Sequence, residues 1–165
     1  MAPKALRVID KDLENFRFCG MIHETFPRAR ILWARRDPVD ACFSAYTKLF
    51  GGDIHYSYDL EECGTYYRAM HELMTHWQAV LPDGVVMAVD YERLLANPPG
   101  MMRLVLEFLG LDWDPRVLRH TEAERAVATS SFVQVRQPLY TTSIGSGRRV
   151  AEHLGPLTRA LGPLA

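Results

Sequence analysis

The sequence predicts an α/β protein with a mostly parallel sheet, because short apolar runs alternate with segments of helical periodicity. Three runs have the length and composition of buried strands, at residues 6–10, 30–35 and 85–89. Helix-like segments separate these runs, so the strands need crossover connections and run parallel. The 165 residues are enough for a substantial core, and we expect residues 1–165 to form a single domain.

The first half of the chain alternates strand and helix signals. The run at 6–10 ends at Asp10-Lys11, and apolar residues then recur at helical spacing over 13–26 until Pro27 ends that helix. After the strand at 30–35, Pro38 fits the first turn of a helix that reaches about residue 50. Gly51-Gly52 ends this helix.

The sequence after residue 58 contains further helix and strand signals. Asp59, with Glu62 three residues later, predicts the start of a helix over 60–80. The strand at 85–89 follows, and Pro98-Pro99 opens a helix that Gly110 ends. Asp114-Pro115 starts a short helix to about residue 121. We expect a long polar loop over 130–149 and a last helix over about 149–161.

Composition indicates a soluble protein without a general affinity for polyanions. Hydrophobic residues make up 48% and charged residues 24%, and the net charge of −1 predicts neither nucleic-acid nor membrane binding. No apolar run approaches the roughly 18 residues of a membrane span, and the amino terminus lacks the apolar core of a signal peptide. The three cysteines, Cys19, Cys42 and Cys63, form no CxxC pair and favour reduced thiols. We therefore predict a cytoplasmic protein.

The stretch from Arg36 to Ser44 is the strongest candidate for a binding site. Arg36 follows the strand at 30–35, and Ser44 lies about two helical turns further on. Ligands of open α/β sheets bind at this strand-to-helix edge, where a guanidinium suits a phosphate by its bidentate geometry. The alternative is structural: Arg36 pairs with Asp37 or Asp40, and Ser44 bonds back to its own helix.

Further residues reach the same edge of the predicted sheet. Tyr91 follows the strand at 85–89 and can present its ring to a base or its hydroxyl to a phosphate, or be a core tyrosine. Lys11 follows the first predicted strand and is either a cation for a developing charge or an ordinary surface lysine. The donor-rich loop over 130–138 either closes over a nucleotide or is a solvated connector.

Other common site chemistries have no support in the sequence. His71 and His76 are five residues apart, which does not place them on one helix face, so we predict no metal site. Neither GxGxxG, a Walker lysine loop nor a GxSxG elbow occurs. These patterns argue against a classical dinucleotide-binding protein, a P-loop NTPase and an α/β-hydrolase.

These elements, taken in order, resemble the carboxyl-terminal part of sulfotransferases that use 3′-phosphoadenosine-5′-phosphosulfate (PAPS). The likeness is greatest to the bacterial branch associated with tetratricopeptide repeats, which is related to tyrosylprotein sulfotransferases. It extends over residues 8–162. The motifs that carry it are Asp10-Lys11 with Asn15-Phe16, Phe26-Pro27-Arg28-Ala29-Arg30, Arg36-Asp37-Pro38-Val39-Asp40 with Ser44, Tyr58-Asp59-Leu60-Glu61, Tyr91-Glu92-Arg93-Leu94 and Gln134-Val135-Arg136-Gln137-Pro138-Leu139-Tyr140.

The resemblance implies a role for each matching residue. Arg36 and Ser44 would hold the 3′-phosphate of PAPS or of 3′,5′-adenosine bisphosphate, with Lys48 as a further basic position. Tyr91 would contact the nucleotide, and Lys11 would stabilise the transition state of sulfuryl transfer. The late loop would wrap the adenosine, with Ser131, Gln134, Arg136, Gln137 and the nearby Arg148 as its binding residues.

The resemblance also implies a three-layer, P-loop-NTPase-like fold without its amino-terminal strand-loop-helix. That missing element, which holds the 5′-phosphosulfate, has no counterpart before Lys11 in residues 1–165. We expect a sulfotransferase-family protein that acts on a hydroxyl or amine acceptor of unknown identity, as a homodimer or with a complementing chain. The alternative is a catalytically inactive nucleotide-binding or protein-interaction module.

Overall fold

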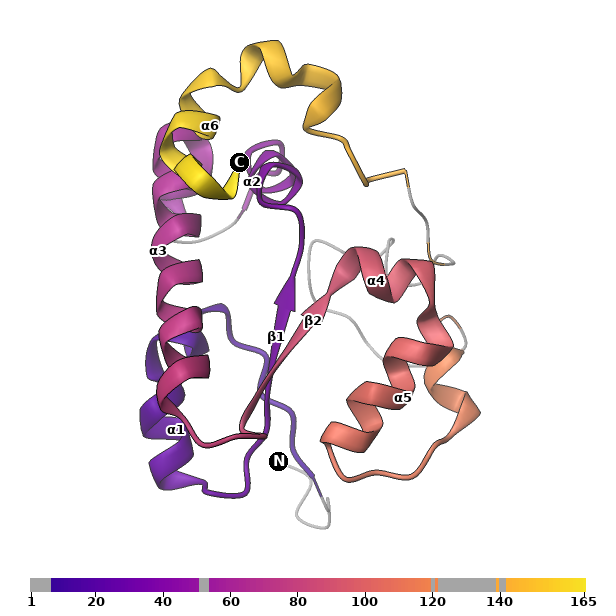
Figure 1. Ribbon diagram of the computed structural model, residues 1–165. Coiled ribbons are helices and arrows are strands. Elements are labelled where there is room, and N and C mark those ends of the chain that lie inside the picture. The colour runs from indigo at the N-terminus through magenta and orange to yellow at the C-terminus, as the bar shows by residue number, and fades with distance from the viewer. Residues whose placement is uncertain (1–6, 51–53, 120, 122–138, 140–141) are drawn as a thin grey trace.

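A computed structural model of the chain describes residues 7–50, 54–119, 121, 139 and 142–165 (Figure 1). Strands β1 (Ile31–Arg35) and β2 (Val86–Asp90) pair in parallel, with Ile31 opposite Val86 and Arg35 opposite Asp90. Two of the three predicted strands are therefore confirmed. The strand predicted at 6–10 is wrong for its described residues, 7–10, which are not in a strand; Leu6 lies outside the described residues.

Helices of two kinds make up most of the remaining described structure. The α-helices are α1 (Cys19–Thr25), α2 (Pro38–Tyr46), α3 (Leu60–Val80), α4 (Tyr91–Ala96), α5 (Pro98–Phe108) and α6 (Gly155–Leu161). The 3₁₀ helices are η1 (Leu13–Phe18), η2 (His55–Tyr58), η3 (Pro115–Leu118), η6 (Arg148–His153) and η7 (Gly162–Leu164). The helix over 60–80 has the predicted bounds, whereas α4 was not predicted, because its six residues are too few for periodicity.

Four predicted helices differ from the structure in extent, and one of them, predicted from Pro115 to about residue 121, ends at Leu118 as η3. The segment 13–26 forms η1 and then α1 instead of one helix, and α2 ends at Tyr46, before the glycine pair. The last helix is divided at Leu154 into η6 and α6. Of the predicted loop over 130–149, residues 142–147 form turns, and residues 130–138 lie outside the described part of the chain.

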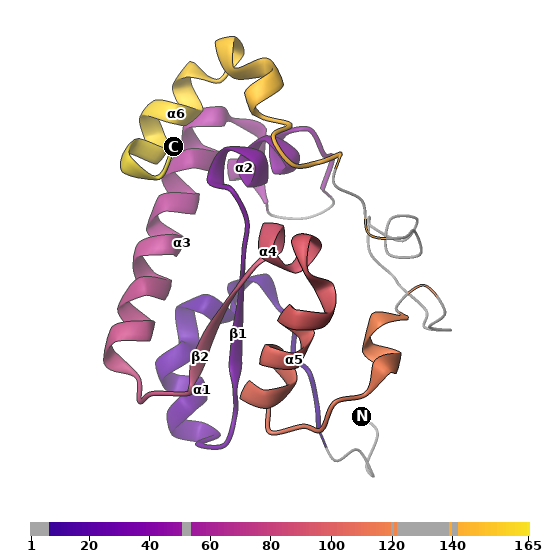
Figure 2. The same cartoon turned by 45° about the vertical axis from the view of Figure 1, so that its right-hand side comes forward.

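The described residues form three layers, with helices on both faces of the strand pair. Helices α1 and α3 lie on one side of β1 and β2, and α4 and α5 lie on the other, in both Figure 1 and Figure 2. The strands point toward α2 and α6, so these two helices lie beyond the carboxyl edge of the sheet (Figure 1). This arrangement confirms the predicted α/β class with a parallel sheet flanked by helices.

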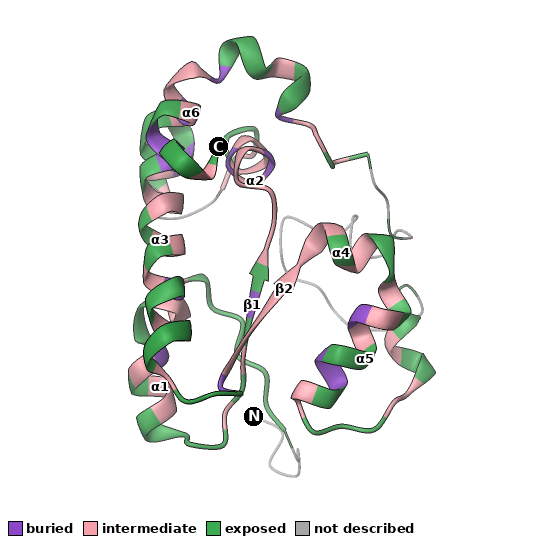
Figure 3. Cartoon of the chain, viewed as in Figure 1, coloured by how far each residue is buried: buried purple, intermediate pink, exposed green. Residues whose placement is uncertain are grey.

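Two apolar clusters hold these layers together. One lies between α1, β1 and α3 and centres on Cys19, Trp33 and Met74. The other joins α2, α3 and α6 through Cys42, Cys63, Leu154, Leu157 and Leu161. Figure 3 shows buried residues along these contacts and on one side of α5. All three cysteines are free and buried, as the sequence predicts.

Helix α6 approaches α3 closely at Gly64. A Cβ atom at this position would lie 2.8 Å from the Cβ of Ala160 and 3.0 Å from the carbonyl oxygen of Leu157. The glycine therefore sets the spacing of the two helices. Because α2 also packs against α6, this contact helps to fix the helix that begins at the carboxyl edge of the sheet.

Candidate functional site

The carboxyl ends of the two strands are tied together by charged side chains. The guanidinium of Arg35 donates from Nε to Oδ1 of Asp90 at 2.7 Å, and its Nη2 lies at the same distance from that oxygen. The backbone N–H of Asp37 donates to Oε1 of Glu92 at 2.9 Å, which joins the turn after β1 to the start of α4. The turn that presents Arg36 is thus fixed from both strands.

Arg36 lies in this turn, and its guanidinium contacts Ser143, Asp40 and Tyr91. Its Nη2 donates to the carbonyl oxygen of Ser143 at 2.6 Å and lies 3.8 Å from Oδ2 of Asp40. The centre of the guanidinium lies 5.5 Å from the ring centroid of Tyr91. Nε of Arg36 and Oγ of Ser143 are buried and have no hydrogen-bond partner in the described structure. Buried donors are normally paired, so these two groups are suited to an oxyanion.

Asp40 connects Arg36 to the turn over residues 142–147. Its carboxylate, 1% exposed, accepts hydrogen bonds from the backbone N–H groups of Gly145 at 2.6 Å and Gly147 at 2.8 Å. The hydroxyl of Ser146 lies 3.2 Å from the same carboxylate. Neither the charge pattern nor the spacing in the sequence revealed this contact, although the pairing of Arg36 with Asp40 was one of the alternatives. Asp40 therefore holds the turn whose Ser143 contacts Arg36.

Gly147 is required by the close approach of this turn to α2. A Cβ atom at Gly147 would lie 2.7 Å from Cγ1 of Val39 and 3.4 Å from Oδ1 of Asp40. The small residues Ser146 and Gly147 allow the backbone to reach the carboxylate of Asp40.

Tyr67 is a further residue at this site that the sequence did not single out. Its hydroxyl donates to the backbone carbonyl of Arg36 at 3.0 Å, from the helix α3 that covers one face of the sheet. Burial raises the pKa of Tyr67 to about 12, so the hydroxyl keeps its proton at neutral pH and remains a donor. The backbone of the turn is thereby bound to the long helix.

The predicted site residues are only partly brought together. Tyr91, the first residue of α4, meets Arg36, while Ser44 is half-buried on α2 and Lys48 is half-buried just after it. Lys11 is exposed before η1, and Arg148 is exposed at the start of η6. Four further predicted residues lie outside the described part of the chain: Ser131, Gln134, Arg136 and Gln137.

Within the described ranges, no group of three or more histidine, cysteine, aspartate or glutamate side chains is placed to hold a metal ion. None of the helices that the structure describes has the length and hydropathy needed to cross a membrane. The chemistry that the described residues offer at the carboxyl edge is the binding of an anion beside an aromatic ring.

The chain is similar in sequence to known proteins over most of its length. The chain is 33% identical over 158 residues to an uncharacterized protein of Aquifex aeolicus. The matched residues cover 94% of this chain and 21% of that protein. It is 29% identical to protein-tyrosine sulfotransferase A of Caenorhabditis elegans, over 72% of this chain and 31% of that one. It is 30% identical to the protein-tyrosine sulfotransferase of Drosophila melanogaster, over 72% of this chain and 24% of that protein.

The chain spans about a fifth to a third of the length of these relatives. The model of the sulfotransferase family matches residues 1–115, which include both strands, Arg36, Ser44 and Tyr91. This match covers more than half of the chain. The protein therefore belongs to the sulfotransferase family.

Proposed function

We propose that this chain binds the 3′-phosphate of PAPS, and of its product 3′,5′-adenosine bisphosphate, through Arg36. The observation that carries the proposal is the buried Nε of Arg36, which has no partner among the described residues. It lies at the carboxyl edge of a parallel strand pair, and Nη2 of the same guanidinium contacts the backbone carbonyl of Ser143, whose Oγ also lacks a partner there. A phosphate oxygen bound by the guanidinium would give Nε an acceptor.

The carboxylate of Asp40 does not preclude this role. It lies 3.8 Å from Nη2 of Arg36, and two backbone N–H groups and one hydroxyl already donate to it. Asp40 therefore orients the guanidinium while much of its own charge is satisfied elsewhere. An arginine held in this way loses little freedom when it binds, and its planar donors suit a phosphate.

The other matching residues extend the proposed site. Tyr91 would place its ring against the nucleotide, since it already lies beside the guanidinium of Arg36. Ser44 and Lys48 would add donors from α2 and the residues after it. The late loop, with Ser131, Gln134, Arg136, Gln137 and Arg148, would cover the adenosine.

The proposed reaction is the transfer of a sulfuryl group from PAPS to a hydroxyl or amine of an acceptor. Like phosphoryl transfer, it requires positioning and neutralisation of charge more than covalent chemistry by the protein. Lys11 would supply positive charge to the bridging oxygen as the bond to sulfur breaks. The three free, buried cysteines favour a reducing compartment, in agreement with a cytoplasmic location.

The proposal is tested by replacing Arg36 with alanine and titrating 3′,5′-adenosine bisphosphate by calorimetry. We expect Arg36→Ala to raise the Kd about 10- to 100-fold, because each charge-assisted hydrogen bond contributes about 1.5–3 kcal/mol. Arg30→Ala is the matched control, since this exposed arginine precedes the opposite end of β1. Equal Kd values for wild type and Arg36→Ala would refute the proposal.

A further inference from the structure

Cys42 of α2 and Cys63 of α3 lie against each other in the apolar cluster that joins these two helices. The thiol of Cys42 donates to the carbonyl oxygen of Cys63 at 3.8 Å, and the thiol of Cys63 donates to the carbonyl oxygen of Cys42 at 3.6 Å. Each sulfur therefore lies beside the backbone of the other cysteine. The two side chains also hydrogen-bond each other, so the sulfurs face one another across the contact between the helices.

This placement suits the formation of a disulfide. A disulfide needs a sulfur–sulfur distance of about 2.05 Å and two side chains that point toward each other. Cys42 and Cys63 already meet the second condition, because each side chain reaches the backbone of the other residue. The two cysteines are 21 positions apart in the chain, so a disulfide would join two separate helices.

Both thiols can be reached by a small molecule, although Cys42 is only 2% and Cys63 only 3% exposed. They line a cavity of about 1060 Å³, most of whose lining comes from η1, α1, α2 and α3. Leu13 and Phe26 belong to the same lining and are 70% and 63% exposed, so the cavity opens to solvent. A volume of about 15 Å³ already holds a water molecule, so this cavity admits a small oxidant.

The two thiols differ in acidity. Cys63 lies near the start of α3 (Leu60–Val80), where the partial positive charge of a helix amino terminus favours a thiolate. The hydrogen bond from Cys42 lowers the pKa of Cys63, while burial and the charge of Asp59 act in the opposite direction. The same hydrogen bond raises the pKa of Cys42, together with burial and the charges of Cys63 and Asp37. Cys63 is therefore the nucleophile of the pair, and Cys42 is the thiol that keeps its proton.

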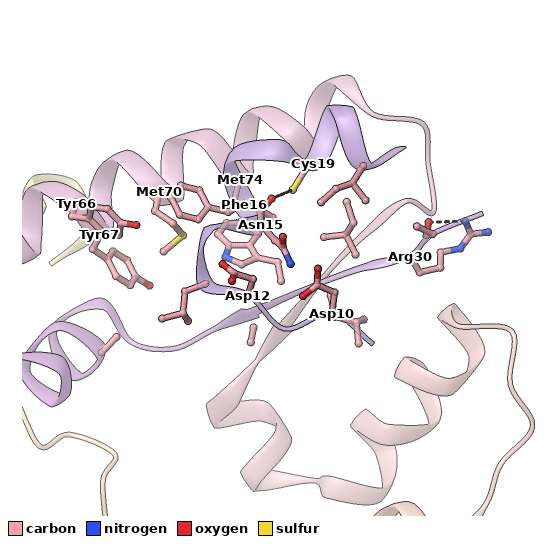
Figure 4. A pocket seen from close by; sticks show the side chains of 18 of the residues that line it. Asp10, Asp12, Asn15, Phe16, Cys19, Arg30, Tyr66, Tyr67, Met70 and Met74 are labelled. Carbon is pink, nitrogen blue, oxygen red and sulfur yellow. Dashed lines mark hydrogen bonds between the residues drawn. The ribbon is translucent and has the colours of Figure 1, made fainter. Parts of the chain in front are cut away.

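Cys19 lines the same cavity but is too far from Cys63 to form a disulfide with it. Its sulfur lies 3.9 Å from that of Met74, and Figure 4 shows Cys19 near Met74, with Tyr67 farther along α3. Met74 follows Cys63 by 11 residues in this helix, which corresponds to about 16 Å along its axis. Cys19 is thus an internal control of equal burial.

We propose that a hydroperoxide oxidises Cys42 and Cys63 to a reversible disulfide between α2 and α3. The thiolate of Cys63 attacks one oxygen of the hydroperoxide, so a sulfur–oxygen bond forms and the oxygen–oxygen bond breaks. The other oxygen takes up a proton and leaves as water or an alcohol. The sulfur of Cys42 then displaces the hydroxyl group of this sulfenic acid, which leaves as water with the proton of Cys42. The two sulfurs lose two electrons, and the hydroperoxide gains them.

The disulfide would connect the two helices that hold the turn of Arg36. Helix α2 begins directly after this turn, and Tyr67 of α3 donates to the carbonyl oxygen of Arg36. All three cysteines are free in the structure, which is therefore the reduced state. The inference rests on the cysteine pair and not on nucleotide binding, so the two proposals can fail separately.

The test maps the disulfide directly. The reduced protein is treated with a small excess of hydrogen peroxide, free thiols are blocked with iodoacetamide, and the peptides are analysed by mass spectrometry without reduction. We expect a pair of peptides joined through Cys42 and Cys63 and lighter by two hydrogen atoms, while Cys19 is recovered alkylated. Dithiothreitol should remove the link. Cys19→Ala is the matched control and should form the same link at the same rate.

Two single variants separate the roles of the paired thiols. In Cys42→Ala, we expect a sulfenic acid at Cys63 that dimedone traps. In Cys63→Ala, we expect Cys42 to react with the peroxide at least about tenfold more slowly than Cys63 does in Cys42→Ala. Circular dichroism checks that both variants fold, and the map of the wild type decides the question if either does not.

Three results for the wild type overturn the inference. These are full alkylation of Cys42 and Cys63 after peroxide treatment, a link that includes Cys19, and a link between two molecules on a non-reducing gel. Equal rates of oxidation in Cys42→Ala and Cys63→Ala would overturn the assignment of Cys63 as the nucleophile.

Discussion

Asp40→Ala is expected to lower the free energy of unfolding by about 3–5 kcal/mol, because it removes a buried carboxylate that accepts three hydrogen bonds and lies 3.8 Å from Nη2 of Arg36. The backbone N–H groups of Gly145 and Gly147 would lose their acceptor in the interior. The turn over residues 142–147 would then detach from α2, and Arg36 would lose both its neighbouring charge and the fixed carbonyl of Ser143. Urea unfolding followed by circular dichroism measures this change.

The control for this substitution is Asp59→Ala at the start of α3. Asp59 is exposed, and its carboxylate accepts hydrogen bonds from the backbone N–H groups of Glu61 and Glu62. Loss of such a cap costs about 1 kcal/mol. If the two aspartate variants are destabilised equally, Asp40 does not have the structural role described above.

Leu157→Ala is expected to destabilise the protein by about 2–5 kcal/mol, because it opens a cavity in a fully buried cluster. The side chain of Leu157 is 0% exposed and packs in the cluster shared by α2, α3 and α6. Gly64 allows α3 and α6 to approach so closely that neighbouring side chains have little room to fill the space. Because α2 begins at the turn that carries Arg36, affinity for 3′,5′-adenosine bisphosphate should fall as well.

Thermal and urea unfolding of Leu157→Ala, compared with Leu104→Ala, check this expectation. Leu104 is 47% exposed on α5, so its truncation should change the free energy of unfolding by less than about 1 kcal/mol. A loss of stability at Leu104 as large as that at Leu157 would contradict the placement of the core between α2, α3 and α6.

Local signals were sufficient for the regular elements and insufficient where the structure depends on distant partners. Helix α3 has its predicted bounds because Asp59 caps its start and Pro82 follows its end. The apolar run at 6–10 has the composition of a strand, but a strand also needs a neighbour for its backbone. The described residues provide none there, and Val8 remains 79% exposed.

The candidate site, too, could be predicted only where it depends on local sequence and the ends of the strands. Parallel strands end at one edge of a sheet, so the residues after the two strands, Arg36 and Tyr91, are predicted to lie close together. In the structure, the centre of the Arg36 guanidinium lies 5.5 Å from the ring centroid of Tyr91. The contact between Asp40 and Gly145 joins residues that are 105 positions apart in the chain. A buried aspartate in a helix resembles a surface one in the sequence, so neither its burial nor its partners could be deduced.

The decisive measurement compares the affinities of 3′,5′-adenosine bisphosphate and 5′-AMP for wild type and Arg36→Ala. The two ligands differ only in the 3′-phosphate, so their Kd ratio isolates the contact proposed for Arg36. We expect the bisphosphate to bind the wild type about 10- to 100-fold more tightly, and the two ligands to bind Arg36→Ala nearly equally. A wild type that does not distinguish them, or an Arg36→Ala variant that still does, would contradict the assignment of the 3′-phosphate to Arg36.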